Sequence, residues 1–176
     1  MELNTSNPIH VSDERGHFVK CFYENSHPSP SDFPIREVFT TSSKKGVIRG
    51  LHFQLPPKSQ SKVITVLKGR IFEVYVDWRK GSDSYGKPVE IILSEPEDKL
   101  YPSSLHIPSG FAHGYQVLEE GTIVLYLADH PYDANLDSAI SFNSFKIDWP
   151  IEKVIVSDKD SSAISFYDFE SPYRLK

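Results

Sequence analysis

The sequence is divided into short runs rich in β-branched and aromatic residues. The clearest runs span residues 62–67, 71–78, 89–93, 115–118 and 122–127. Such runs predict β-strands, and strands spaced by roughly 8–12 residues, without an amphipathic helical pattern between them, are typical of a sandwich or barrel. We therefore predict an all-β protein, and among all-β folds we favour a jelly roll.

Turn-forming residues stand between these runs, at 68–70, 80–83, 95–98 and 119–121. They predict that most neighbouring strands join as hairpins, which makes the sheets antiparallel. The proline-rich segment 27–34 is predicted to be a loop. Only the tail, around residues 161–169, has a sequence that could form a short helix.

Length and composition narrow the class of protein. The chain has 176 residues and no recognisable linker, so residues 1–176 are expected to form a single domain. A net charge of −5 argues against a nucleic-acid polymer as partner. No stretch approaches the roughly 20 apolar residues of a membrane span. The lone cysteine, Cys21, cannot form an internal disulfide, so we expect a cytoplasmic protein.

Two motifs each carry one histidine close to a glycine: RGLHFQ at 49–54 and IPSGFAHG at 107–114. Together they could bring His52 and His113 to one cavity. A metal site is the first hypothesis, because the cupin type of jelly roll often binds a metal through His-x-His, a carboxylate and a later histidine. Here Gln54 stands where the second histidine would be. Two histidines without a nearby carboxylate fall short of the usual three protein ligands, so we expect no metal there.

Proton transfer is the second hypothesis, because a neutral imidazole oriented by a carboxylate can act as a general base near pH 7. Asp160 and Tyr126 are candidates for the partner acid, and Lys62, at the start of a strand, could stabilise an oxyanion. Each residue type also has an ordinary structural role, as a hydrogen-bonded histidine, a core tyrosine or a solvated lysine. Spacing alone leaves both interpretations open.

Seven sequence blocks add a further argument. They lie at 13–16, 46–54, 60–63, 76–82, 107–114, 147–150 and 157–160. Taken together and in this order, they closely resemble the dTDP-4-dehydrorhamnose 3,5-epimerase family over nearly the whole chain. The resemblance implies a cupin-type jelly roll that forms a homodimer and needs no metal or cofactor. It also implies a nucleoside-diphosphate 4-keto-6-deoxyhexose as substrate, with inversion at C3, C5 or both through an enolate.

The resemblance further implies catalytic roles. His52 matches the family's general base, Asp160 the carboxylate that orients it, and Tyr126 the acid that delivers a proton from the opposite face. Lys62 and His113 match residues around the C4 keto oxygen. Those residue types suit the chemistry, since a proton next to a ketone becomes acidic only if the enolate is stabilised.

Substrate-binding roles are implied in the same way. Arg49 matches a substrate-binding arginine, and Tyr132 matches an aromatic residue that stacks on the nucleobase. Asp137 occupies the place of a family glutamate. Arg15 and Lys159 match nucleotide-binding cations, which could pair with a diphosphate.

Three positions on the nucleotide side depart from the family pattern. Lys20 stands where a glutamate is usual, and Glu37 and Phe39 stand where the family has Gln-x-Asn. A lysine can only donate hydrogen bonds, whereas cytosine offers acceptors at N3 and O2, so a CDP-linked sugar is an alternative to a dTDP-linked one. In the other interpretation, Lys20 simply points to solvent.

Other functions remain open at this point. A mono-epimerase of a deoxysugar pathway would share His52, Asp160 and Tyr126 but invert one centre. A catalytically silent cupin that binds a sugar nucleotide is disfavoured, because drift is expected to erase at least one of these residues. A metal-dependent cupin oxygenase requires ligands that this chain lacks. We therefore expect an isomerase.

Overall fold

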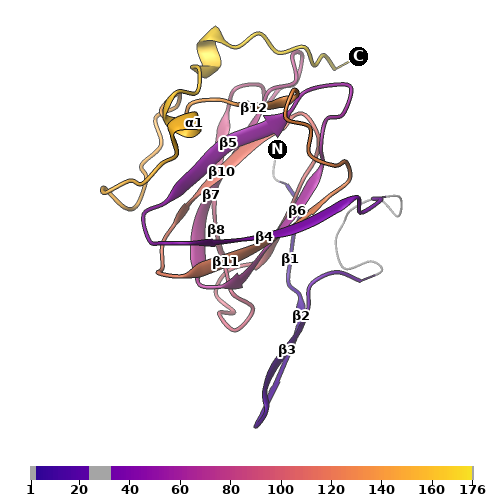
Figure 1. Ribbon diagram of the computed structural model, residues 1–176, viewed down its shortest axis with the longest axis vertical. Coiled ribbons are helices and arrows are strands. Elements are labelled where there is room, and N and C mark those ends of the chain that lie inside the picture. Colours follow the sequence, from indigo (N-terminus) through magenta and orange to yellow (C-terminus); the bar gives the residue numbers. More distant parts are fainter. Residues whose placement is uncertain (1–2, 24–32, 176) are drawn as a thin grey trace.

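A computed structural model describes residues 3–23 and 33–175, so most of the predicted loop 27–34 lies outside the described residues. The described chain forms two five-stranded sheets that face each other, with a separate two-stranded hairpin beside them (Figure 1). The strand pairs are antiparallel in all three sheets. The prediction of an all-β, antiparallel fold is confirmed.

The strands are ordered as follows. The first sheet contains β1 (Thr5–Ser6), β9 (Ser104–Ile107), β6 (Lys62–Lys68), β11 (Thr122–Ala128) and β4 (Glu37–Ser43). The second sheet contains β12 (Asp137–Ala139), β5 (Ile48–Gln54), β10 (Phe111–Val117), β7 (Arg70–Asp77) and β8 (Pro88–Ser94). The hairpin consists of β2 (Ile9–Asp13) and β3 (Gly16–Lys20).

The hairpin connections predicted from the turns are mostly wrong. The turn at 80–83 does lie between two paired strands, β7 and β8. The other three turns join strands of different sheets: β6 to β7, β8 to β9, and β10 to β11. A glycine such as Gly69, with φ of +78°, reverses the chain equally well in either case. The chain therefore alternates between the two sheets, which is the topology of a jelly roll.

The core divides into two layers that β7 separates. Ile71 and Tyr75 pack between the two sheets, whereas Phe72, Val74 and Val76 pack on the outer side of the second sheet. Alternate side chains of a strand point to opposite faces, so β7 is buried on both. Each fully buried side chain of this size contributes about 1.5–3 kcal/mol to the free energy of unfolding. The outer layer is covered by the C-terminal tail.

The tail contains two short helical turns, α1 (Asp158–Ser161) and the 3-10 turn η1 (Phe166–Asp168). The turn η1 lies inside the predicted short helix at 161–169, and α1 meets that range only at Ser161, so the tail has two short turns where one helix was predicted. Each turn has a serine N-cap, and the Ser157 side chain accepts a hydrogen bond from the Asp160 amide. A serine cap satisfies an otherwise unpaired amide and so favours the start of a helical turn at that place.

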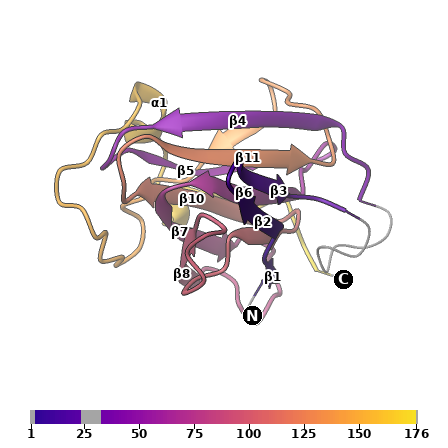
Figure 2. The ribbon, with the colours of Figure 1, turned by 90° about the horizontal axis from the view of Figure 1, so that it is seen from below.

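The hairpin of β2 and β3 pairs with no strand of the two large sheets among the described residues. It extends well beyond the barrel in Figure 1, and it lies in front of the barrel when the molecule is seen from below (Figure 2). None of the described residues belongs to a helix that is long and apolar enough to cross a membrane.

Candidate active site

The two motif histidines lie opposite each other on neighbouring strands. His52 of β5 and His113 of β10 are direct cross-strand partners, so their side chains leave the sheet on the same face. The glycines of the two motifs explain this arrangement. A Cβ on Gly114 would lie 2.8 Å from the Gly50 Cα and 2.5 Å from the Arg49 carbonyl oxygen. The two strands can approach this closely only because both positions lack a side chain.

The facing sheet contributes a second row of side chains. Lys62 of β6 pairs with Ala128 of β11, and Tyr126 pairs with Ile64 on one side and Phe39 of β4 on the other. Ile64 and Tyr126 both belong to the core between the sheets. Residues two apart on a strand share a face, so Lys62 follows Ile64 towards the end of the barrel.

A cavity of about 330 Å³ opens between these two rows. Its lining residues are Glu37, Phe39, His52, Gln60, Lys62, Tyr132, Asp137 and Lys159. Seven of the thirteen residues singled out from the sequence are therefore in this lining. Asp160, His113 and Tyr126 stand directly behind it, as their contacts show.

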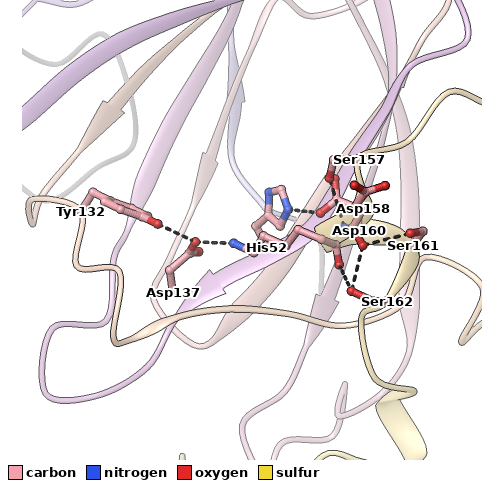
Figure 3. A network of polar contacts seen from close by, with 9 residues as sticks. His52, Tyr132, Asp137, Ser157, Asp158, Asp160, Ser161 and Ser162 are labelled. Atoms are coloured by element: carbon pink, nitrogen blue, oxygen red, sulfur yellow. Dashed lines mark hydrogen bonds and ion pairs between the residues drawn. The ribbon is translucent and has the colours of Figure 1, made fainter.

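His52 is held by Asp160. Its Nε2 lies 2.6 Å from Oδ1 of Asp160, whose side chain is 5% exposed, and Figure 3 shows the ring turned towards this carboxylate. Burial alone would raise the pKa of Asp160, but hydrogen bonds from His52, Ser157 and the Gly50 amide outweigh it and lower the pKa. The carboxylate therefore stays ionised and favours a proton on the ring nitrogen that faces it. The other ring nitrogen of His52 is left to accept a proton.

His113 has a different carboxylate partner, Glu73 of β7, with 2.9 Å between its Nδ1 and Oε1 of Glu73. Both side chains are buried. Burial raises the pKa of Glu73 well above its usual value, although Lys62 opposes the shift. Burial, together with the positive charges of Lys62 and His52, lowers the pKa of His113 well below its usual value. Both shifts favour the uncharged forms, a carboxylic acid beside a neutral imidazole.

That protonation state has a chemical consequence. A protonated Glu73 donates its hydrogen to Nδ1 of His113, which places the ring's own hydrogen on Nε2. His113 then offers an N–H donor rather than a lone pair.

The sequence analysis did not predict Glu73 as a site residue. Its position carried a signal, because Glu73 shares the inward face of β7 with Ile71 and Tyr75, where a carboxylate needs a partner.

Tyr126 is buried beside Phe39, with ring centroids 4.5 Å apart and planes within 9°. Burial raises the pKa of Tyr126 well above its usual value, and a hydrogen bond with the Tyr115 hydroxyl adds to the shift, while Arg49 opposes it. Tyr115 in turn contacts the Thr41 hydroxyl at 2.8 Å. Tyr126 therefore keeps its proton until a stronger base appears. Tyr115 is a further residue that the sequence did not indicate.

Lys62 is a buried cation in the cavity lining. Burial lowers the pKa of Lys62, and the nearby acidic side chains of Asp137, Glu73 and Glu37 oppose the shift. An ammonium group in such a poorly solvated position interacts strongly with any negative charge that develops nearby.

A second polar cluster occupies the outer part of the cavity. Asp137 accepts a hydrogen bond of 3.1 Å from the Tyr132 hydroxyl (Figure 3). It also forms an ion pair with Lys159. The backbone amide of Tyr132 donates to Glu37 at 3.0 Å. The Tyr132 ring is largely exposed, so one of its faces is available for stacking.

Three predicted site residues lie elsewhere. Arg15 and Lys20 are exposed on the β2–β3 hairpin, away from the cavity within one chain, and Arg15 forms an ion pair with Asp13. Arg49 donates to the Ser43 hydroxyl at 3.1 Å. Although absent from the lining, Arg49 acts on the Tyr126 hydroxyl through its charge.

Gln54, at the position of the missing metal ligand, has a structural role. Its buried side chain donates to the carbonyl groups of Lys58 and Pro131 and accepts from the Asp133 amide. These bonds hold the loop that carries Tyr132.

The fold and the site together define a class: a cupin-type jelly roll with a hydrogen-bonded histidine–aspartate pair and a buried tyrosine on the facing sheet. Comparison with known proteins identifies the family. A family model described as dTDP-4-dehydrorhamnose 3,5-epimerase matches residues 2–168. The chain belongs to the dTDP-4-dehydrorhamnose 3,5-epimerase family and is an isomerase.

Individual relatives agree with this assignment. The chain is 36% identical over 165 residues to dTDP-4-dehydrorhamnose 3,5-epimerase of Shigella flexneri, covering 92% of this chain and 89% of the relative. It is 40% identical to the crystal structure of the enzyme from Sulfolobus tokodaii, with a TM-score of 0.79 and coverage of 92% and 89%. A Legionella pneumophila epimerase in complex with dTDP-4-keto-L-rhamnose is 29% identical, with a TM-score of 0.83 and coverage of 99% and 100%.

Proposed function

We propose that this protein inverts C3 and C5 of dTDP-4-keto-6-deoxyglucose to give dTDP-4-keto-L-rhamnose. The observation that carries the proposal is the position of the base and the acid. His52, bonded to Asp160, comes from the second sheet, and Tyr126 comes from the first. A sugar ring seated between the sheets would meet the base on one face and the acid on the other. Inversion of a carbon requires such an arrangement.

Each inversion begins with the removal of a proton. The ring nitrogen of His52 that does not face Asp160 takes the proton from a carbon next to the C4 ketone. The electron pair of the broken C–H bond moves to the C4 oxygen and forms an enolate. Lys62 and the N–H of His113 stabilise that negative charge.

Return of a proton completes the inversion. The enolate carbon takes the phenolic proton of Tyr126 from the opposite face, and the C4 carbonyl forms again. Exchange with solvent then removes the proton from His52 and returns one to Tyr126. The sequence of steps leaves the oxidation state of the sugar unchanged, so we propose that the reaction needs no cofactor.

The nucleotide part of the substrate is assigned to the cluster of Tyr132, Asp137 and Lys159 at the mouth of the cavity. We propose thymidine diphosphate, with support from the Legionella neighbour, which binds a dTDP sugar. Lys20, on which the CDP alternative rests, lies on the same hairpin as Arg15 and is absent from the cavity lining of its own chain, so it would bear on the nucleotide only in a partner's cavity.

Product analysis tests this proposal. Purified protein is given dTDP- or CDP-linked 4-keto-6-deoxyglucose, and the product is followed by NMR. We expect dTDP-4-keto-L-rhamnose from the first substrate, with a kcat/KM at least tenfold above that for the CDP sugar. Product inverted at C3 alone or C5 alone would identify a mono-epimerase, and preference for the CDP sugar would overturn the nucleotide assignment.

The hairpin supports a homodimer. It exposes three large apolar side chains, Ile9, Val11 and Phe18, which are 40%, 55% and 56% exposed. An apolar patch on a projecting element is typical of an interface. We propose that a second copy of the chain covers it, and that Arg15 thereby reaches the diphosphate in the partner's cavity. Such an enzyme would act in the cytoplasm, where nucleotide sugars are made.

A further inference from the structure

Two histidines and a glutamate meet where the hairpin lies against the barrel. His10 lies on β2, His17 on β3, and Glu97 in the loop after β8. The Glu97 Oε1 atom is 3.5 Å from Nε2 of His10 and 3.8 Å from Nδ1 of His17. This is the one group in the described part of the chain that brings together three side chains able to ligate a metal, with one ligand atom from each and all within 4.8 Å of one another.

The spacing suits a small dication. A tetrahedral Zn²⁺ with ligands at about 2.0–2.2 Å places neighbouring ligand atoms roughly 3.3–3.6 Å apart. One of the two histidine–glutamate distances falls in that range and the other exceeds it by a few tenths of an ångström. The ligand atoms of His10 and His17 lie within 4.8 Å of each other, and rotation of the exposed His17 and Glu97 side chains (57% and 56% exposed) can bring all three atoms to ligand spacing.

The ligand types suit the same ion. Two imidazole nitrogens and one carboxylate oxygen form a set that first-row transition metals bind, and a fourth position stays open to water. The site faces a surface hollow of about 540 Å³, so solvent has access to it. Glu95 and Lys68 also line the hollow, and the Ser12 hydroxyl lies 3.4 Å from Nε2 of His10. Glu95 already accepts a hydrogen bond of 2.8 Å from the Gly69 amide.

We propose that His10, His17 and Glu97 bind one first-row divalent transition-metal ion, for which Zn²⁺ is the probe. The ion connects both strands of the hairpin to the loop between β8 and β9. A two-stranded hairpin is marginally stable by itself, and this one has no strand partner in the barrel among the described residues. The metal therefore acts as a structural clip, separate from the proton-transfer site.

Zn²⁺ titration of metal-stripped protein tests the clip. Binding is measured by competition with a chromophoric chelator for the wild type and for His10→Gln, His17→Gln and Glu97→Gln. Each substitution should weaken binding at least tenfold. His130→Gln is the matched control, since His130 is also a surface histidine beside a carboxylate, with its Nδ1 3.3 Å from Asp129. His52→Ala removes the imidazole of the proton-transfer site as a competing ligand.

The expected result is one Zn²⁺ per chain in the wild type, in His130→Gln and in His52→Ala. Zn²⁺ should also raise the thermal midpoint of these three proteins and leave that of His17→Gln unchanged. The proposal is overturned if the wild type binds no Zn²⁺, if any of the three cluster variants binds as tightly as the wild type, or if the control loses as much affinity as they do.

Discussion

At the scale of single residues, two histidines acquire different tasks from their carboxylate partners. Asp160 has a lowered pKa and stays ionised, so His52 keeps a proton on the side of the aspartate and a lone pair on the other. Glu73 has a raised pKa, which favours its protonated form and with it a donor role for His113. The sequence identified both histidines and named Asp160 as a candidate partner, and the family resemblance implied its orienting role. Glu73 was missed because one carboxylate inside an apolar strand forms no motif.

Replacement of Tyr126 by phenylalanine separates the two halves of the reaction. The variant keeps the ring that stacks on Phe39 and loses the hydroxyl that is the proposed proton donor, together with its hydrogen bond to Tyr115. Inversion should fall by at least about 100-fold, the usual contribution of a general acid, while exchange of the substrate proton with solvent falls much less. Both are measured by NMR in heavy water, with the exposed Tyr167→Phe as control. Equal loss of exchange and inversion would contradict the role of Tyr126.

Glu73 makes the stability of the protein depend on pH with a definite sign. Its pKa is about 4.5 in the unfolded chain and well above that in the folded state. Above pH 4.5 the folded protein therefore holds a proton that the unfolded chain has lost. The wild type therefore loses stability as the pH rises from there towards the folded pKa. Glu73→Gln cannot ionise and still offers a donor to His113.

Relative to the wild type, Glu73→Gln should therefore gain in thermal midpoint as the pH is raised from 5 to 8. Thermal melts at several pH values measure this shift. A constant difference would show that Glu73 has an ordinary pKa in the folded protein.

Glu73→Leu, which removes the bond to His113, should lose most of the activity that Glu73→Gln keeps.

At the scale of elements, the clearest strands, β6, β7, β8, β10 and β11, were predictable and their partners were not. The runs at 62–67 and 122–127 have the composition of strands whichever sheet they join. Turn residues such as Gly69 and Gly121 mark a reversal of the chain but do not say whether it stays in the same sheet. Partners follow from which faces can be buried together, and in a jelly roll this brings together strands far apart in sequence.

The close approach of β5 and β10 gives a prediction at this scale. A methyl group at Gly114 would meet backbone atoms of Arg49 and Gly50 at 2.5 and 2.8 Å, and backbone cannot move aside cheaply. Gly114→Ala should therefore destabilise the protein by about 1–3 kcal/mol and displace His113. Gly121→Ala is the control, because its Cβ would have nothing within 4 Å and only its φ of +71° is unfavourable. Denaturant unfolding should show the larger loss for Gly114→Ala; an equal loss in both variants would count against a steric role for Gly114.

At the scale of the whole molecule, the cavity and the hairpin are separate parts of one chain. The sequence grouped Arg15 and Lys20 with the cavity residues, yet the structure places them on the projecting hairpin. The order of the family blocks along the chain does not show which copy of the chain in a homodimer supplies each residue to a site. A homodimer in which hairpins cross over would bring the two sets together.

Co-expression of two inactive variants tests the shared site. A chain with Arg15→Ala keeps His52, and a chain with His52→Ala keeps Arg15. If each site uses both chains, a mixed dimer contains one intact site, and a random mixture recovers about a quarter of the wild-type activity. A mixture no more active than the sum of the separate variants would place Arg15 outside the partner's site.

The central claim is that His52 abstracts a proton from a carbon next to the C4 ketone. Deuterium incorporation from heavy water into dTDP-4-keto-6-deoxyglucose, read carbon by carbon by NMR, measures that step directly. The wild type should exchange the protons at C3 and C5, and folded His52→Ala should exchange them at least about 100-fold more slowly. Undiminished exchange in His52→Ala, or no exchange at either carbon in the wild type, would contradict the account.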